Sequence, residues 1–160
     1  MRRVPPPVRI GAELAVYLQA GISITVATRD GDLRPDGARA WGVRVHEDGE
    51  HLTVFLYEGA APDVLRNLEA HPQIALAFDR PTDNRACQLK GLFVRSRRAR
   101  DDEEDEVARQ VDGFLRELET LGIPRAMTGG WRSWPCIAVE LRVTHLYEQT
   151  PGPGAGEPLR

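Results

Sequence analysis

The chain has 160 residues, of which 28% are charged and 41% hydrophobic, a composition that is ordinary for one globular domain. Its formal net charge of -3 gives no reason to expect a nucleic-acid partner. No apolar run approaches the roughly 20 residues that a membrane-spanning helix needs, so we expect no membrane association. Residues 1–3 precede prolines rather than an apolar stretch, which argues against a signal peptide and makes the cytoplasm the default location.

Six segments alternate between apolar and polar residues, which is the pattern of half-buried β-strands. Residues 22–28 show it most clearly, because Ile24 and Val26 alternate with small or polar neighbours. The other five segments cover residues 38–45, 51–57, 73–78, 86–94 and 137–144. Asp-Gly pairs at 30–31 and 48–49 predict tight turns between the first three strands, since glycine readily adopts positive φ.

Three segments have helical spacing of their apolar residues. Residues 10–20 end before a glycine, residues 62–72 end in a proline, and residues 101–121 carry a long apolar stripe. The long helix begins with an acidic run, residues 101–106, at the end where the helix dipole favours anions. We interpret this run as a solvated cap in preference to an acidic docking patch.

Six strands, sparse helices and no β-α-β alternation predict a mainly β fold, an antiparallel closed or split barrel with flanking helices. The barrel domain is predicted to cover residues 1–148. Residues 149–160 are rich in glycine and proline, and we expect them to form a flexible tail without a packed element.

The order of these elements and three short phrases resemble the pyridoxamine 5′-phosphate oxidase-like family of split-barrel flavoproteins. The phrases are ITVATRDG at 24–31, LEAHPQIAL at 68–76 and QLKG at 88–91, and the resemblance covers roughly residues 10–148. It implies a six-stranded antiparallel split β-barrel of the FMN-binding type. It also implies a homodimer that holds FMN in two equivalent clefts at the subunit interface.

The resemblance assigns the FMN phosphate to basic residues of the second strand, where Arg39 and Arg44 stand in this chain. Arginine suits a phosphate because its charged, planar group can donate two parallel hydrogen bonds. The alternative for both residues is a solvated arginine at a strand end. A basic motif that usually opens the helix after the third strand is replaced by Pro62, Asp63 and Val64, so two cations are lost and one anion gained. We therefore expect weaker phosphate binding than in relatives that keep the motif.

The resemblance also places flavin contacts on the fifth strand. A glutamine that relatives often carry there is Ala86 in this chain, and Gln88, two residues along on the same face, is the candidate substitute. Lys90 shares that face and is a second candidate contact for flavin oxygens or phosphate. An ordinary exposed lysine is the favoured alternative for Lys90.

Small and aromatic residues supply the remaining candidates. Ala40 and Gly42 let a planar ligand approach the second strand closely. Trp41 lies between them and either walls the flavin ring or packs in a core or dimer interface. Trp131 and Arg132 belong to a loop before the last strand, which is interpreted equally as a ligand lid or as a place where Trp131 and Trp134 plug the barrel end or the dimer interface.

We predict no metal site and no hydrolytic chemistry. The two cysteines lack Cys-x-x-Cys spacing, and the four histidines lack the spacing of metal ligands. Three hypotheses remain. The first is an oxidoreductase that uses FMN at a homodimer interface, the second a non-catalytic protein that holds haem or another planar cofactor, and the third a cofactor-free dimer.

Overall fold

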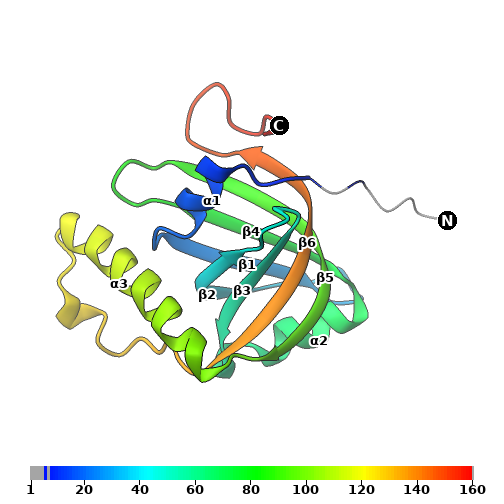
Figure 1. The fold of residues 1–160 in the computed structure, drawn as a ribbon, viewed down its shortest axis with the longest axis horizontal. Coiled ribbons are helices and arrows are strands. Elements are labelled where there is room, and N and C mark those ends of the chain that lie inside the picture. Colours follow the sequence, from blue (N-terminus) through cyan, green and yellow to red (C-terminus); the bar gives the residue numbers. More distant parts are fainter. Residues whose placement is uncertain (1–5, 7, 160) are drawn as a thin grey trace.

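A closed six-stranded antiparallel barrel forms the centre of the computed structural model, which describes residue 6 and residues 8–159 (Figure 1). The strands are β1 (Ser23–Arg29), β2 (Pro35–Val45), β3 (His51–Tyr57), β4 (Gln73–Asp79), β5 (Ala86–Arg98) and β6 (Cys136–Glu148). Around the barrel they follow the order β1-β2-β3-β6-β5-β4, and pairing of β1 with β4 closes the ring. The predicted fold class is confirmed.

Three helices flank the barrel, as predicted: α1 (Ala12–Leu18), α2 (Pro62–Ala70) and α3 (Glu104–Thr120). Short 3-10 turns, η1 (Glu58–Ala60), η2 (Asp101–Glu103) and η3 (Arg125–Met127), lie in the connections. Strands β5 and β6 both extend beyond their predicted bounds. Arg95 to Arg98 of β5 still pair with Glu140 to Ile137 of β6, because ladder hydrogen bonds continue after the apolar alternation stops.

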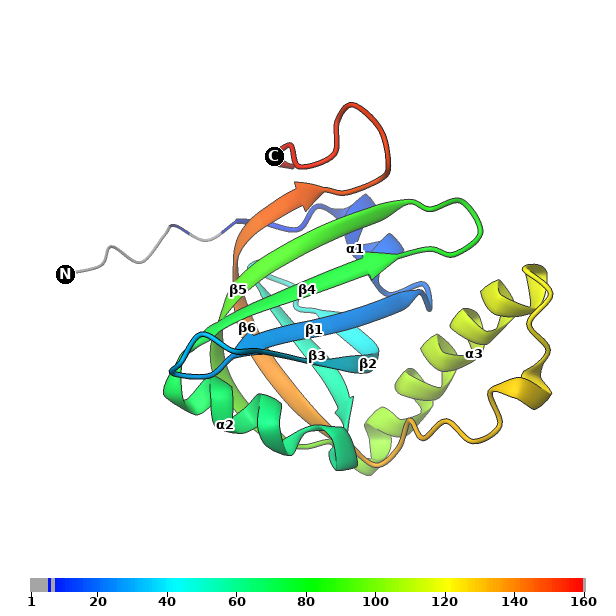
Figure 2. The ribbon, with the colours of Figure 1, turned by 180° about the vertical axis from the view of Figure 1, so that it is seen from behind.

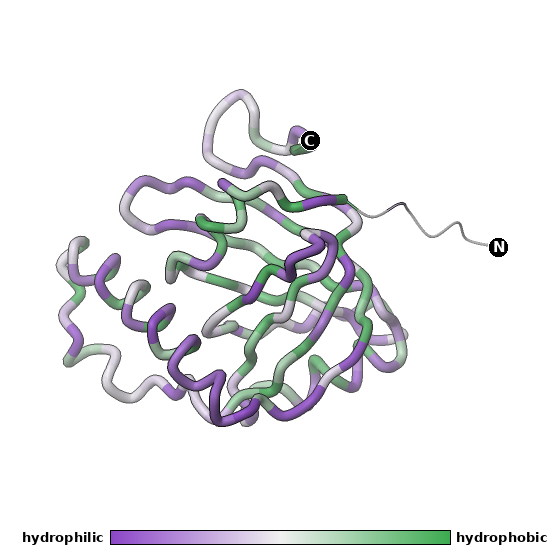
Figure 3. Tube along the Cα trace, in the orientation of Figure 1, coloured by the Kyte–Doolittle hydropathy of each residue, from purple (hydrophilic) through white to green (hydrophobic). Residues whose placement is uncertain are grey.

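Alternation along the strands fills the barrel with apolar side chains, and Figure 3 shows the hydrophobic residues gathered along the strands. These buried apolar side chains fill the interior, so a planar ligand has to bind outside the barrel. Fully or nearly fully buried interior residues include Ile24, Val26, Val43, Leu52, Val54, Leu56, Leu76, Phe78, Leu89, Val139, Leu141 and Val143.

Helix α3 lies against the outer surface of β2 and covers a second, smaller core (Figure 1). That core contains Phe55, Val107, Cys136 and Ala138, with Trp41, Ala99, Val111 and Trp134 packed against it. Trp134 is half-buried and packs against this outer core. The helix approaches the turn after α1 closely, since a Cβ on Gly113 would stand 2.7 Å from the carbonyl oxygen of Ala20.

The tail after β6 folds back along that strand. An isolated antiparallel bridge joins Tyr147 to Pro158, and the Leu159 N–H donates to the Leu146 carbonyl at 2.9 Å. Leu159 also packs against the main core. Three backbone hydrogen bonds between residues 146–148 and 156–159, together with Leu159, hold the described part of the predicted flexible tail against β6.

Among the described residues, no helix is both long enough and apolar enough to span a membrane.

Candidate functional site

The outer surfaces of β1 and β4 form an exposed face of small side chains. Thr25, Ala27, Ala75 and Ala77 point outward, while the residues between them fill the barrel. Figure 2 shows β1, β4 and β5 in front, with no helix lying across them. A sheet face of this kind permits close approach by a second sheet or by a planar ligand.

Arg39 stands at the β2 side of this face, where its guanidinium lies among three aromatic rings. The guanidinium carbon is 5.0 Å from the ring centre of Phe114, 5.8 Å from that of Trp131 and 5.9 Å from that of Trp41. The Trp41 and Trp131 rings are themselves 5.8 Å apart, and Trp131 stacks on Phe114 at 6.3 Å. We call Arg39, Trp41, Phe114 and Trp131 the Arg39 cluster. It joins three proposed site residues from two distant segments, Arg39 and Trp41 of β2 and Trp131 of the loop before β6.

The Arg39 guanidinium has no carboxylate within 4 Å among the described residues; its hydrogen bond goes to the Ser23 hydroxyl at 3.3 Å. Desolvation by the surrounding groups lowers its pKa, whereas the charge of Asp79 acts in the opposite direction. An arginine keeps its proton at neutral pH in any such setting. Arg39 therefore presents a positive charge that no anion among the described residues neutralises by direct contact.

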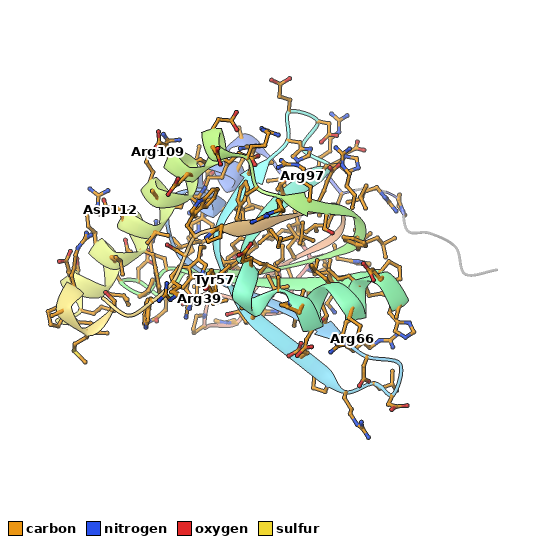
Figure 4. The ribbon with its side chains drawn as sticks, turned by 90° about the horizontal axis from the view of Figure 1, so that it is seen from below. Arg39, Tyr57, Arg66, Arg97, Arg109 and Asp112 are labelled. Carbon is orange, nitrogen blue, oxygen red and sulfur yellow. The ribbon has the colours of Figure 1, made fainter. Side chains whose placement is uncertain are left out.

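Tyr57 extends this site toward α2. The register that pairs Ala40 with Leu56 brings Tyr57 next to Arg39, and the two residues lie together at the start of α2 in Figure 4. Tyr57 is half-buried, and its ring lies against Gly59, where a Cβ would stand 2.5 Å from a ring carbon.

The first turn of α2 supplies no cation, as the sequence indicated. Asp63 is exposed and pairs with Arg66, which points away from the barrel in Figure 4. Val64 is fully buried in the main core. This position serves packing here, so a basic residue there would disrupt the barrel rather than extend the site.

The expectation that Ala40 and Gly42 form one open surface is wrong. A β-bulge between them lets Ala40 face the barrel interior while Gly42 stays on the outer side. On that outer side the Gln110 side chain of α3 covers Gly42, at 3.5 Å from a Cβ placed there. Neither residue has an open face, and we leave both out of the proposed site.

Arg44 lies further along β2 and is engaged by carboxylates. Its guanidinium donates to Glu103 at 2.9 Å and contacts Glu106 through two nitrogens. Hydrogen bonding to Glu106, offset in part by burial, raises its pKa. A phosphate would have to compete with two anions for this residue, so we leave Arg44 out of the flavin site too.

Gln88 and Lys90 lie on the outer surface of β5, at the opposite side of the exposed face from Arg39. The cross-strand register aligns Arg39 with Thr25, Thr25 with Ala77, and Ala77 with Gln88. The Lys90 ammonium lies 5.4 Å from the Tyr147 ring centre. Arg132 is exposed, next to Trp131 in the chain.

Sequence reasoning missed Phe114, Tyr57 and Glu103. Phe114 belongs to the apolar stripe of α3, and its position after Gly113 places it beside the turn that follows α1. Glu103 belongs to the acidic run that was interpreted as a solvated cap, yet its side chain is only 1% exposed. The run of arginines at the end of β5 could have indicated a buried Glu103, because a buried carboxylate needs cationic partners.

Among the described residues, no group of three or more metal-ligating side chains is present. Cys87 and Cys136 are buried, and burial raises the pKa of each thiol to about 12. Both therefore stay protonated and unreactive at neutral pH.

No protein-family profile matches the chain, and no curated protein matches its sequence. Solved structures do match it. A candidate pyridoxamine 5′-phosphate oxidase from Lactobacillus delbrueckii is 14% identical, with a TM-score of 0.54 over 87% of this chain and 93% of that chain. An FMN-binding protein from Syntrophomonas wolfei is 10% identical, with a TM-score of 0.54 over 82% and 80%. The HupZ protein of Group A Streptococcus is 14% identical, with a TM-score of 0.56 over 92% and 99%. At these identities the likeness establishes the fold, which is that of the pyridoxamine 5′-phosphate oxidase-like and FMN-binding split barrels.

Proposed function

We propose that this chain binds FMN as a homodimer and acts as a flavin-dependent oxidoreductase. The observation that carries the proposal is Arg39, a cation that has no carboxylate partner in the described part of the chain and lies among aromatic rings beside an exposed face of small residues. The FMN-binding protein of Syntrophomonas wolfei has the same fold, which supports the choice of ligand.

In this proposal each group of the site has one task. Arg39 holds the phosphate through charge-assisted hydrogen bonds. Trp41 and Trp131 offer ring faces against which a planar ligand stacks. Flavin, when bound, supplies the electron or hydride transfer, while the chain binds the ring, orients it and limits its contact with water.

The proposed homodimer buries the exposed face of β1 and β4. A two-fold interface places the same patch of both subunits in contact, and small side chains let the two sheets approach closely. Gln88 and Lys90, at the far side of this face, are the candidates to complete the cleft of the second subunit. Arg132 is the candidate to contact the ligand from the Trp131 loop.

A second candidate function is the binding of haem or another planar ligand that carries no phosphate. The absence of cations in the first turn of α2, where Asp63 and buried Val64 stand, favours this alternative. A cofactor-free dimer is the third possibility. Absorption spectra of the protein mixed with FMN and with haem separate the three.

Titration of flavin fluorescence tests the proposal. We expect saturable quenching of FMN by the native chain and weaker binding by Arg39→Ala, roughly tenfold or more, because one charged hydrogen bond contributes about 1.5 to 3 kcal/mol. Riboflavin, which lacks the phosphate, should bind both proteins alike. Arg109→Ala is the matched control, since Arg109 points away from the barrel on α3 (Figure 4). Absence of saturable quenching by the native chain would overturn the FMN assignment.

Light scattering tests the dimer separately. The native chain should have twice the monomer mass, and Ala77→Glu should shift it toward the monomer by placing two carboxylates in the interface. Ala108→Glu, on the exposed surface of α3, should leave the mass unchanged. A native monomer at micromolar concentration contradicts the proposed interface.

A further inference from the structure

A polar cavity, with a volume of about 130 Å³, lies on the outer surface of the barrel where β2, β3, β5 and β6 meet η2. This volume is several times what one water molecule requires. Four arginines line the cavity, together with Thr53, His46, Ala138 and Glu140: Arg44 of β2, Arg95 and Arg97 of β5, and Arg100 of the loop that follows.

A buried carboxylate fixes three of these arginines. Glu103 is 1% exposed and lies 2.9 Å from Arg44, 2.7 Å from Arg97 and 3.3 Å from Arg100. Each guanidinium therefore has a defined position before any ligand arrives. Preorganised donors bind an anion at a smaller entropic cost than flexible surface side chains.

The cavity keeps unused hydrogen-bond donors. A guanidinium carries five N–H groups, and Arg95 uses its Nε to contact Glu140 at 2.6 Å. Among the described residues, neither terminal nitrogen of Arg95 has a protein hydrogen-bond partner. Glu103, Glu106 and Asp102 already pair with Arg44, Arg97 and Arg100, so these three arginines contribute mainly a fixed cationic wall. Arg95, which is 71% exposed and pairs with Glu140, supplies the donors that a ligand can use without displacing a carboxylate.

The geometry points to a binding site for a small oxyanion, either free phosphate or the phosphate group of a small metabolite. Clustered guanidinium groups match the oxygen geometry of a phosphate and hold their charge at any physiological pH. The neutralising carboxylates keep the affinity moderate. We call this cavity the arginine pocket.

The arginine pocket is separate from the proposed flavin site. Arg44 stands five residues beyond Arg39, roughly 16 Å along an extended strand. The bulge at Trp41 and the Gln110 side chain of α3 lie between the two. Binding in the pocket therefore does not depend on whether the chain binds flavin.

Calorimetric titration with inorganic phosphate, at constant ionic strength in chloride, tests the site. The native chain should bind one phosphate per subunit. Arg95→Gln should weaken binding roughly tenfold through the loss of charged hydrogen bonds. Glu140→Gln removes the one anion of the lining and should strengthen binding several-fold.

Arg98→Gln is the matched control. Arg98 lies on the same strand, is similarly exposed and pairs with one carboxylate, Glu58 at 3.2 Å, but it does not line the pocket. The Arg98→Gln variant should bind phosphate with the same affinity as the native chain. Glycerol phosphate distinguishes the two ligand sources, because a site for a metabolite's phosphate group should bind this ester at least as tightly as the free ion. No saturable binding of either ligand, or equal weakening by Arg95→Gln and Arg98→Gln, would overturn the assignment.

Discussion

Gln110 of α3 makes two hydrogen bonds with the backbone of Val43 on β2. Its Oε1 accepts from the Val43 N–H at 3.0 Å, and its Nε2 donates to the Val43 carbonyl at 2.8 Å. The pairing of β1 with β2 reaches only as far as Ala40. The side-chain amide therefore takes the place of a strand at the point where the sheet would otherwise leave buried backbone groups unpaired.

Replacing Gln110 by alanine should destabilise the protein by about 2 kcal/mol or more, since a buried donor and a buried acceptor are both left unsatisfied. Arg109→Ala, its exposed neighbour, should change stability by less than about 0.5 kcal/mol. Urea unfolding of both variants gives the comparison. Equal stability of the two would show that the amide does not replace a strand.

Two glycines with similar positive φ provide a test of the contact between α3 and the turn after α1. Gly21 has φ of 81° and Gly122 has φ of 84°, so an alanine is strained to a similar degree at both. At Gly21 a Cβ would also stand 2.4 Å from the Gln110 carbonyl oxygen, whereas at Gly122 it would meet nothing within 4 Å. Gly122→Ala should lower the free energy of unfolding by about 1 to 2 kcal/mol, and Gly21→Ala should lower it clearly more. Thermal unfolding that gives the same loss for both would contradict the close helix contact.

Local alternation predicted the barrel because each strand has one face in the core. Ile24 and Val26 face inward as expected, since a period of two fixes both the strand and its buried face. The bulge at Trp41 was not predictable in this way. It depends on a partner strand and on Gln110, which lie far away in the sequence, and it reverses the faces of the residues that follow.

The candidate site was only partly predictable for the same reason. Arg39, Trp41 and Trp131 were proposed from the resemblance and from loop composition, and the fold brings them together. Arg44 matched the same pattern, but its environment is set by Glu103 and Glu106. The residues next to Arg44 in the sequence do not indicate which carboxylates of a distant helix will pair with it.

Glu103 should make the protein sensitive to acid. Hydrogen bonding from Arg97, together with bonds from the Arg100 backbone and Arg44, outweighs burial and lowers the pKa of Glu103 to about 2. A carboxyl whose folded-state pKa is depressed contributes stability that is fully present above its ordinary pKa, near 4.3, and is lost as the pH falls toward 2.

Glu103→Gln should therefore lower the free energy of unfolding by about 3 kcal/mol at pH 7. At pH 3 this difference in unfolding free energy from the native chain should be smaller. Glu104→Gln, an exposed change in the same acidic run, is the control and should have little effect at either pH. Chemical unfolding at both pH values measures the differences. A difference that does not depend on pH would rule out the proposed ion-pair origin.

Asp63→Arg tests whether α2 faces the phosphate of a bound flavin. Asp63 is exposed, so the change should be tolerated, whereas a basic residue at buried Val64 should unfold the barrel. Exchanging an anion for a cation in the first turn of α2 should tighten FMN binding roughly fivefold, which corresponds to about 1 kcal/mol. Glu69→Arg makes the same charge change at the exposed far end of the helix and should have a smaller effect on FMN binding.

Riboflavin affinity should not change in either variant, because riboflavin has no phosphate for the new cation to contact. Equal strengthening of FMN and riboflavin binding, or an equal effect of both substitutions, would show that the first turn of α2 does not contact the phosphate.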